Sequence, residues 1–239
     1  MSAYGVIVKE HCAIQLHSTA WKVRSKDVDA ESRAIVMFHL TLSNAPSELV
    51  AYMHEDFADE LERGDKYPQE PETGARLGRE AFEAYFFAAD VLVGIHTNIL
   101  KEGYGVEVQE AITPEVLKGS RTWKDCVAGF YYVKPNYPGR SSHICNAGFV
   151  VPFSSRGQGF ASVLARSYLH YAPRLGYQAS VFNLVYVNNS ANIHLKENLG
   201  FEKAGRIPHA GRLKRKDEQG EEYVDAWVFY KSFDTDVRN

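Results

Sequence analysis

The chain has 239 residues, of which 45% are hydrophobic and 24% are charged. This apolar content excludes a disordered chain and is ample for a buried core. The 27 Lys and Arg against 30 Asp and Glu give a net charge of -3, which argues against binding nucleic acid through bulk positive charge.

The cysteine and histidine patterns predict a protein without disulfides or metal. Cys12, Cys126 and Cys145 are odd in number and far apart, with no CxxC pair, and the nine histidines form no HExxH motif. No apolar run approaches the ~20 residues of a membrane span, and the N-terminus lacks a secretory signal pattern. We therefore expect a cytoplasmic protein with no membrane partner, and leave a mitochondrial location open.

The first third of the chain reads as strands followed by two helices. Residues 4–24 and 33–43 have strand-like composition. A helical spacing then starts at Ser47 and stops at Gly64. Its apolar positions are Leu49, Val50, Met53, Phe57 and Leu61. A second helix is predicted over 79–88.

From residue 90 onward the chain alternates strands and helices. Strands are predicted over 90–97, 126–133, 142–151, 179–187, 201–214 and 222–233, and helices over 157–174 and 190–199. Residues 98–125 look like an irregular insertion. A helix between neighbouring strands indicates an α/β class with a mixed sheet. We expect one domain over 1–239, with an N-terminal part at 1–89 and a core at 90–233.

The turn between the strand at 142–151 and the following helix has the composition of an anion-binding turn. It contains Arg156, Gly157, Gln158, Gly159, Phe160 and Ala161. Small residues expose consecutive backbone N–H groups at a helix N-terminus, which suits a pyrophosphate. By itself a glycine-rich turn is also compatible with a plain strand-to-helix connection, and this one has neither the GK[ST] of a Walker loop nor GxGxxG spacing.

The pattern Arg156-x-x-Gly159-x-Ala161 resembles the acyl-CoA pyrophosphate loop of the GCN5-related N-acetyltransferases, the GNAT superfamily. The segment from Asn189 to Gly200-Phe201 resembles the Asn-x-x-Ala…Leu-Gly-Phe helix of the same superfamily. The resemblance implies the GNAT fold, a mixed sheet flanked by helices, with splayed strands that form the acetyl-CoA cleft. It also implies acetyl-CoA as cosubstrate and direct acetyl transfer.

Further segments resemble the fungal proline-analogue N-acetyltransferases, which acetylate L-azetidine-2-carboxylate. They include FYYVKPNY at 130–137, SHICNAGF at 142–149, FNLV at 182–185 and PHAG at 208–211. This resemblance implies a small cyclic secondary amino acid as substrate, a detoxifying role, and a homodimer.

Three asparagines are the candidate site residues. Asn183 lies in a strand that is apolar on both sides and is expected to be buried, so its amide needs a hydrogen-bond partner. Asn146 lies on the preceding strand, and the two amides are expected to converge on a small carboxylate. Asn189 is a preferred helix N-cap, and the resemblance places it near the thioester and the attacking nitrogen. Asn183 and Asn189 are therefore the candidate catalytic residues.

The sequence also predicts structural roles for residues around these sites. Phe149, Val150 and Val151 are expected to pair their backbone with the pantetheine arm, and Gly148 to mark a bulge that opens this strand. Lys196 occupies the place where many superfamily members have a tyrosine that protonates the thiolate. We expect Lys196 to be a solvated helix residue.

The sequence therefore predicts an acetyl-CoA-dependent N-acetyltransferase of a small cyclic amino acid. Two alternatives remain open at this stage. One is an acetyltransferase of protein N-termini or lysines, and the other is a non-catalytic acyl-CoA-binding sensor.

Overall fold

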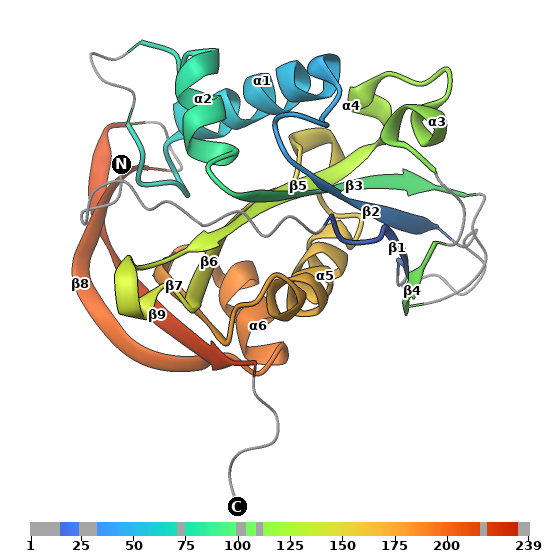
Figure 1. Cartoon of the computed structure of the whole chain (residues 1–239). Helices are drawn as coiled ribbons and strands as arrows, with labels where there is room; N and C mark the ends of the chain where they lie inside the picture. Colours follow the sequence, from blue (N-terminus) through green and yellow to red (C-terminus); the bar gives the residue numbers. More distant parts are fainter. Residues whose placement is uncertain are drawn as a thin grey trace, which may run out of the picture.

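The computed structural model describes residues 15–23, 33–70, 75–98, 104–108, 112–215 and 219–233. Their strands form one nine-stranded sheet in the order β4-β1-β2-β3-β5-β6-β7-β9-β8. Helices cover both faces, with α1 and α2 on one side and α5 and α6 on the other (Figure 1). The mixed α/β architecture predicted from the sequence is confirmed.

The N-terminal half supplies an antiparallel block and two helices. Its strands are β1 (Thr19–Lys22), β2 (Ala34–Leu40) and β3 (Asp90–Thr97), and its helices are α1 (Ser47–Arg63) and α2 (Arg79–Phe86). All five apolar positions predicted for α1 are buried, and Gly64 ends the helix at φ 65°. Residues 4–14 and 24 of the first predicted strand lie outside the described residues.

The interval 98–125 is less irregular than expected. It contains β4 (Tyr104–Glu107), which pairs with β1, and two short helices, α3 (Pro114–Lys118) and α4 (Trp123–Cys126). The helices begin at threonine caps, since the Thr113 hydroxyl accepts from Val116 and Thr122 forms a capping box with Asp125. The described part of this interval thus extends the sheet edge.

The second half carries the strand–helix–strand unit expected from the sequence. Its elements are β5 (Val127–Pro135), β6 (Ile144–Val150), α5 (Phe160–Arg174), β7 (Ala179–Tyr186), α6 (Ser190–Asn198), β8 (Glu202–Lys214) and β9 (Glu221–Ser232). β6 and β7 are parallel, as a crossover through α5 requires.

The bulge expected at Gly148 is wrong. β5 and β6 pair in continuous register from Phe130↔Val150 to Pro135↔Cys145. Gly148 instead makes room for the ring of Tyr132 on the neighbouring strand, because a Cβ there would lie 2.6 Å from Tyr132 Cε1. The irregularity lies in β7, where pairing with β9 shifts between Phe182 and Val185.

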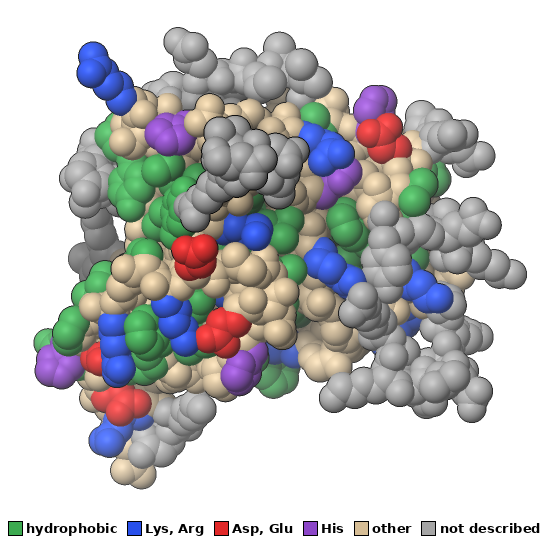
Figure 2. Space-filling view, turned by 90° about the horizontal axis from the view of Figure 1, so that it is seen from below, with side chains coloured by type: hydrophobic (Ala, Val, Ile, Leu, Met, Phe, Trp, Pro, Cys, Tyr) green, Lys and Arg blue, Asp and Glu red, His purple; other side chains and the backbone are tan. Residues whose placement is uncertain are grey.

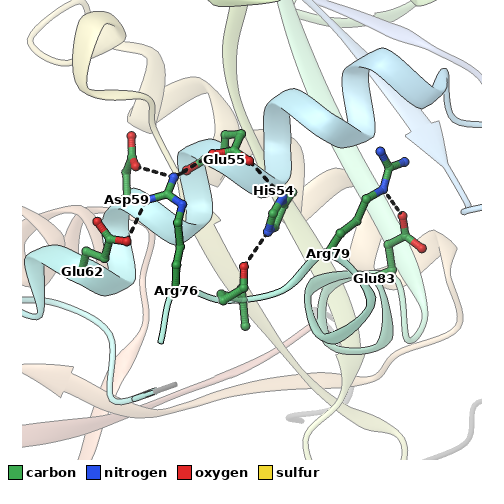
Figure 3. Close-up of polar contacts among 8 residues, drawn as sticks. His54, Glu55, Asp59, Glu62, Arg76, Arg79 and Glu83 are labelled. Carbon is green, nitrogen blue, oxygen red and sulfur yellow. Dashed lines mark hydrogen bonds and ion pairs between the residues drawn. The ribbon is translucent and has the colours of Figure 1, made fainter. Parts of the chain in front are cut away.

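An arginine clamp joins α1 to the segment that leads into α2. Arg76 pairs with three acids on one side of α1, Glu55, Asp59 and Glu62, at 2.7–2.8 Å (Figure 3). Nearby, His54 of α1 contacts the carbonyl of Leu77 at 2.7 Å. The clamp fixes the segment that leads into α2 against α1.

Candidate active site

The central feature of the site is a separation between β6 and β7. Their parallel pairing consists of Ile144↔Ala179 and Cys145↔Ser180 and goes no further. Beyond these residues β6 continues to Val150. The backbone of Phe149 and Val150 therefore forms no strand pairing with β7. A polar arm such as pantetheine fits there, because unpaired backbone N–H and C=O groups need partners.

The glycine turn has the geometry that its sequence predicts. Gly157 and Gly159 have φ of 74° and 81°, and α5 starts at Phe160 directly after them. A helix start leaves N–H groups without intrahelical partners, and Gly159 provides no capping side chain. The Gln158 amide is held by Arg33 at 2.7 Å, and the Phe160 ring is buried. The turn therefore offers an anion site next to the separated strands.

Arg156 lies in this turn, but its side chain is directed toward α1. Its Nε donates to the carbonyl of Val151 at 3.2 Å, and its Nη2 pairs with Glu60. Glu60 is only 3% exposed and also pairs with Arg63, so two arginines compensate its buried charge. Arg156 thus joins the glycine turn to α1.

The same cluster raises the pKa of Asp56 to about 6. Burial is the main cause, and the negative charge of Glu60 adds to it, while Arg63 and Arg156 oppose the rise. One buried carboxylate oxygen of Asp56 has no hydrogen-bond partner. At neutral pH the folded protein therefore carries an unfavourable carboxylate beside the glycine turn.

The structure brings Asn146 and Asn183 together through a third amide, Asn136. The Oδ1 atom of Asn136 accepts from Asn146 at 2.5 Å and from Asn183 at 2.7 Å, and its Nδ2 donates to Asn183 Oδ1 at 3.2 Å. Tyr137 adds a hydroxyl donor to Asn183 at 3.3 Å. The sequence did not single out Asn136, although it directly follows Pro135 in a segment quoted for its family likeness.

Asn183 is not buried, contrary to expectation. The strand is buried at Ala179–Phe182 and at Val185–Tyr186, but Asn183 and Leu184 are exposed. They lie where the β7–β9 register shifts, which turns these two side chains away from the core. Asn146 is partly buried, and its Oδ1 atom is buried without a partner. The amide cluster therefore has one face open to a ligand.

Asn189 fulfils the capping role. Its side chain accepts from the backbone N–H of Asn192 at 3.2 Å at the start of α6. Across the site, Tyr67 donates to the carbonyl of Phe149 at 2.5 Å, and burial raises its pKa well above the ordinary value. One backbone acceptor of β6 is thus already bonded to a side chain of the α1–α2 connection.

A lysine stands opposite Asn146 on β5. Lys134 is the register partner of Asn146, and its Nζ lies 3.8 Å from the ring centre of Tyr85 and 4.2 Å from that of Tyr132. Burial lowers the pKa of Lys134 to about 8. Its Nζ donates to the carbonyl of Tyr85 at 3.3 Å, and among the described residues it pairs with no carboxylate.

Lys196 is buried, so the expectation of a solvated helix residue is wrong. It is 2% exposed and is the only buried side chain of α6. Its Nζ lies 3.1 Å from the ring centre of Phe182 and 4.8 Å from that of Phe149. The aromatic neighbours come from elements distant in sequence, which explains why a single lysine in a short helix carried no signal of burial.

The histidines His143 and His209 are exposed. His143 contacts the carbonyl of Arg140 at 3.2 Å, and His209 adopts φ 51° with its N–H bonded to Asp225 at 2.8 Å. Within the described ranges, no three His, Cys, Asp or Glu side chains are placed to hold a metal ion. The helices of those ranges include none that is long and apolar enough to cross a membrane.

Comparison with known proteins agrees with this geometry. A family model described as the acetyltransferase (GNAT) family matches residues 101–201. The N-acetyltransferase aca1 of Schizosaccharomyces pombe is 40% identical over 174 residues, which cover 73% of this chain and 75% of that protein.

Solved structures share the fold. A GCN5-related N-acetyltransferase from Kribbella flavida superposes with a TM-score of 0.60 at 21% identity, covering 82% of this chain and 97% of the other. The yncA protein of Salmonella typhimurium, solved with its cofactor acetyl-CoA, gives 0.56 at 16% identity and covers 85% and 97%.

The mixed sheet with its separated parallel strands and glycine turn defines an acyl-CoA-dependent acyltransferase. The chain belongs to the acetyltransferase (GNAT) family and is an acetyl-CoA-dependent N-acetyltransferase.

We predict that Asp56→Asn stabilises the protein at high pH. Because the folded pKa of Asp56 lies above its ordinary value of 3.8, the wild type loses stability as pH rises through about 6. Removing the charge should raise the free energy of unfolding by about 1–2 kcal/mol at pH 8 and leave it unchanged at pH 4. Urea denaturation at both pH values measures this. Glu222→Gln, an exposed acid on β9, is the control and should show no such gain; equal behaviour of the two variants would contradict the assignment.

Proposed function

We propose that the enzyme acetylates the nitrogen of a small amine that carries a carboxylate, and that a cyclic secondary amino acid such as L-azetidine-2-carboxylate is the best fit. The observation that supports this is the juxtaposition of the three-asparagine cluster with Lys134. An amino-acid acceptor needs neutral hydrogen-bonding groups around its nitrogen and a cation for its carboxylate, and both kinds lie on the same pair of strands.

Lys134 is the cation of this arrangement. It is the direct cross-strand partner of Asn146, and such partners have Cβ atoms roughly 4.5–5.5 Å apart. Burial disfavours its charge, and aromatic ring faces compensate only part of that cost. An acceptor carboxylate would supply the missing counter-charge, so substrate binding would raise the pKa of Lys134 toward its ordinary value.

A separate small pocket lies between the α1–α2 connection and strands β7 and β8. It has a volume of about 220 Å³ and is lined by Pro68, Glu70, Tyr186, Ala210, Gly211 and Arg212. This is below the roughly 300–1,000 Å³ typical of sites for drug-sized ligands. The Tyr186 hydroxyl is buried without a partner, and an Arg212–Glu70 ion pair at 3.1 Å joins two walls.

The cosubstrate would lie between β6 and β7. The N–H groups at Gly157–Ala161 would hold the pyrophosphate, and the backbone of Phe149–Val151 would pair with the pantetheine arm. Acetyl-CoA supplies the activated acetyl group. The residues of the chain contribute position and fixed dipoles: the asparagine cluster orients the acceptor nitrogen, Asn189 helps to align it, and backbone N–H groups face the carbonyl oxygen as negative charge develops there.

An acceptor panel with Lys134→Met tests the proposed function. We expect release of free CoA with azetidine-2-carboxylate and little with the corresponding carboxamide, a peptide, or no acceptor. Lys134→Met should raise the KM for the carboxylate at least about tenfold, as loss of a charge-assisted hydrogen bond implies, and remove most of the preference over the carboxamide. Peptide acetylation alone would establish the rival function, and CoA binding without turnover on any acceptor would favour a sensor.

A second prediction concerns the asparagine cluster. Asn183→Ala removes one end of the reciprocal amide pair with Asn136 and should raise the acceptor KM at least about tenfold. The KM for acetyl-CoA should change less than about twofold, since the amide lies outside the proposed cosubstrate contacts. Asn198→Ala, an exposed amide at the end of α6, serves as the control. Unchanged kinetics in Asn183→Ala would refute its place in the acceptor site.

The glycine turn is tested with two matched glycines at the ends of α5. Gly159→Glu places a carboxylate where the pyrophosphate would bind and should abolish acetyl-CoA binding in calorimetry. Gly176→Glu introduces a similar backbone penalty, because Gly176 has φ 91° and lies just past the other end of α5. The second variant should lose comparable stability and still bind acetyl-CoA. Binding retained in Gly159→Glu would move the cosubstrate elsewhere.

A further inference from the structure

Lys196 is a buried ionisable side chain whose positive charge no described residue balances. It is the only buried side chain of a short helix, in a position where leucine or methionine would pack at no electrostatic cost. Burial is the cause of its lowered pKa, and no neighbouring carboxylate counteracts it. Within the described part of the chain, Nζ has no ion pair and no hydrogen bond, only three ring faces.

Those rings place Lys196 at the separated strands. Phe149 belongs to β6 and Phe182 to β7, and their ring centres are 6.2 Å apart across the line where the two strands part. Phe201, just after α6, contributes the third face at 5.1 Å. Nζ therefore sits between side chains of the two strands that would enclose the thioester.

The same face of α6 carries Asn189. Asn189 caps the helix, and Lys196 follows seven residues later, which is two helical turns. The helix start and the buried ammonium are therefore aligned on one side.

Glu202 of β8 is exposed, and the described charged groups nearest to Lys196 in the chain pair with other residues. Glu197, the acid next to Lys196, pairs with Lys203 of β8 at 2.7 Å and with His194 at 3.4 Å. Lys231 of β9 lies over the Phe201 ring and donates to the Gly200 carbonyl. From α5, the phenol of Tyr168 donates to Ser180 at 2.6 Å. Within the described ranges none of these groups pairs with Lys196, so an anionic ligand would supply a counter-charge that this part of the chain does not.

We propose that Lys196 faces the sulfur of the acetyl-CoA thioester and balances the charge of the thiolate that leaves. As the acceptor nitrogen forms its bond to the acetyl carbon, the carbon–sulfur bond breaks and its electron pair stays on sulfur beside the ammonium. The acceptor nitrogen releases its proton to solvent, and the thiolate takes up a proton from solvent as CoA departs, while Nζ keeps its own. Burial alone disfavours the charged form of Lys196, and the negative charge of the thiolate would favour it.

This inference rests on the proposed placement of acetyl-CoA between β6 and β7, and it does not depend on the acceptor. It also gives a role to the residue at the position where many superfamily members have a tyrosine. Because Lys196 is a cation and tyrosine is neutral, it should lower the pKa of the product thiol. This change can be measured with CoA alone.

The test is an ultraviolet titration of CoA bound to the enzyme, without any acceptor. A thiol near a lysine ammonium has a lowered pKa, so thiolate absorbance should appear at a pH at least about one unit lower for bound than for free CoA. Lys196→Met should abolish this difference while acetyl-CoA still binds. Lys231→Met, which removes a charge from the outer side of the same Phe201 ring, should retain it. An equal shift in the wild type and Lys196→Met would overturn the proposal.

A second measurement uses only the wild type, in case Lys196→Met does not fold. CoA and desulfo-CoA are compared by calorimetry from pH 6 to pH 9. The affinity of CoA should rise relative to that of desulfo-CoA as the bound thiol ionises. Parallel affinities over the whole range would overturn the role of Lys196, while binding of both ligands would leave the cosubstrate site intact.

Discussion

The loss of pairing between β6 and β7 is the constraint on which the rest of the site depends. Two parallel residue pairs join the strands, and beyond Cys145 and Ser180 the ladder stops. Each functional feature is arranged around this separation. The asparagine cluster forms where it begins, the glycine turn lies beyond the end of β6, and the rings of Phe149 and Phe182 fill its other side. The sheet tolerates the separation because β6 remains paired with β5 and β7 with β9.

Two lysines flank the separation from opposite faces of the sheet. Lys134 lies against α2 through Tyr85, and Lys196 lies on α6 on the face of α5. Both have lowered pKa values caused by burial, and both rest on aromatic rings. Part of the exposed surface differs: at the lower left of the face seen from below, Lys and Arg side chains lie beside Asp and Glu side chains (Figure 2). These two lysines are the groups that we propose for a substrate carboxylate on one face and for the thiolate on the other.

The buried acid of α1 differs from the two lysines, because direct ion pairs balance its charge. Glu60 is nearly inaccessible, yet Arg63 and Arg156 pair with it directly. This ion-pair group joins the glycine turn to α1, while the Arg76 clamp fixes the segment before α2. Together they hold the α1–α2 connection, whose Tyr67 reaches the Phe149 carbonyl. The position of Tyr67 beside β6 is thus supported by charge compensation on α1.

The sequence by itself determined the element order, the amphipathic α1 and the glycine turn, because helical periodicity, caps and positive-φ glycines are local properties. It also identified Asn146 and Asn183 as neighbours. Only the tertiary structure decided that Asn136 joins them, that Asn183 is exposed, that Gly148 accommodates Tyr132 and that Lys196 is buried. Each of these depends on register or on contacts between distant strands, which no local pattern encodes. Lys134 and Lys196 are the clearest examples. From the sequence, a charged residue in a short helix or strand is predicted to be exposed to solvent. Only the fold brings together the aromatic residues that bury it.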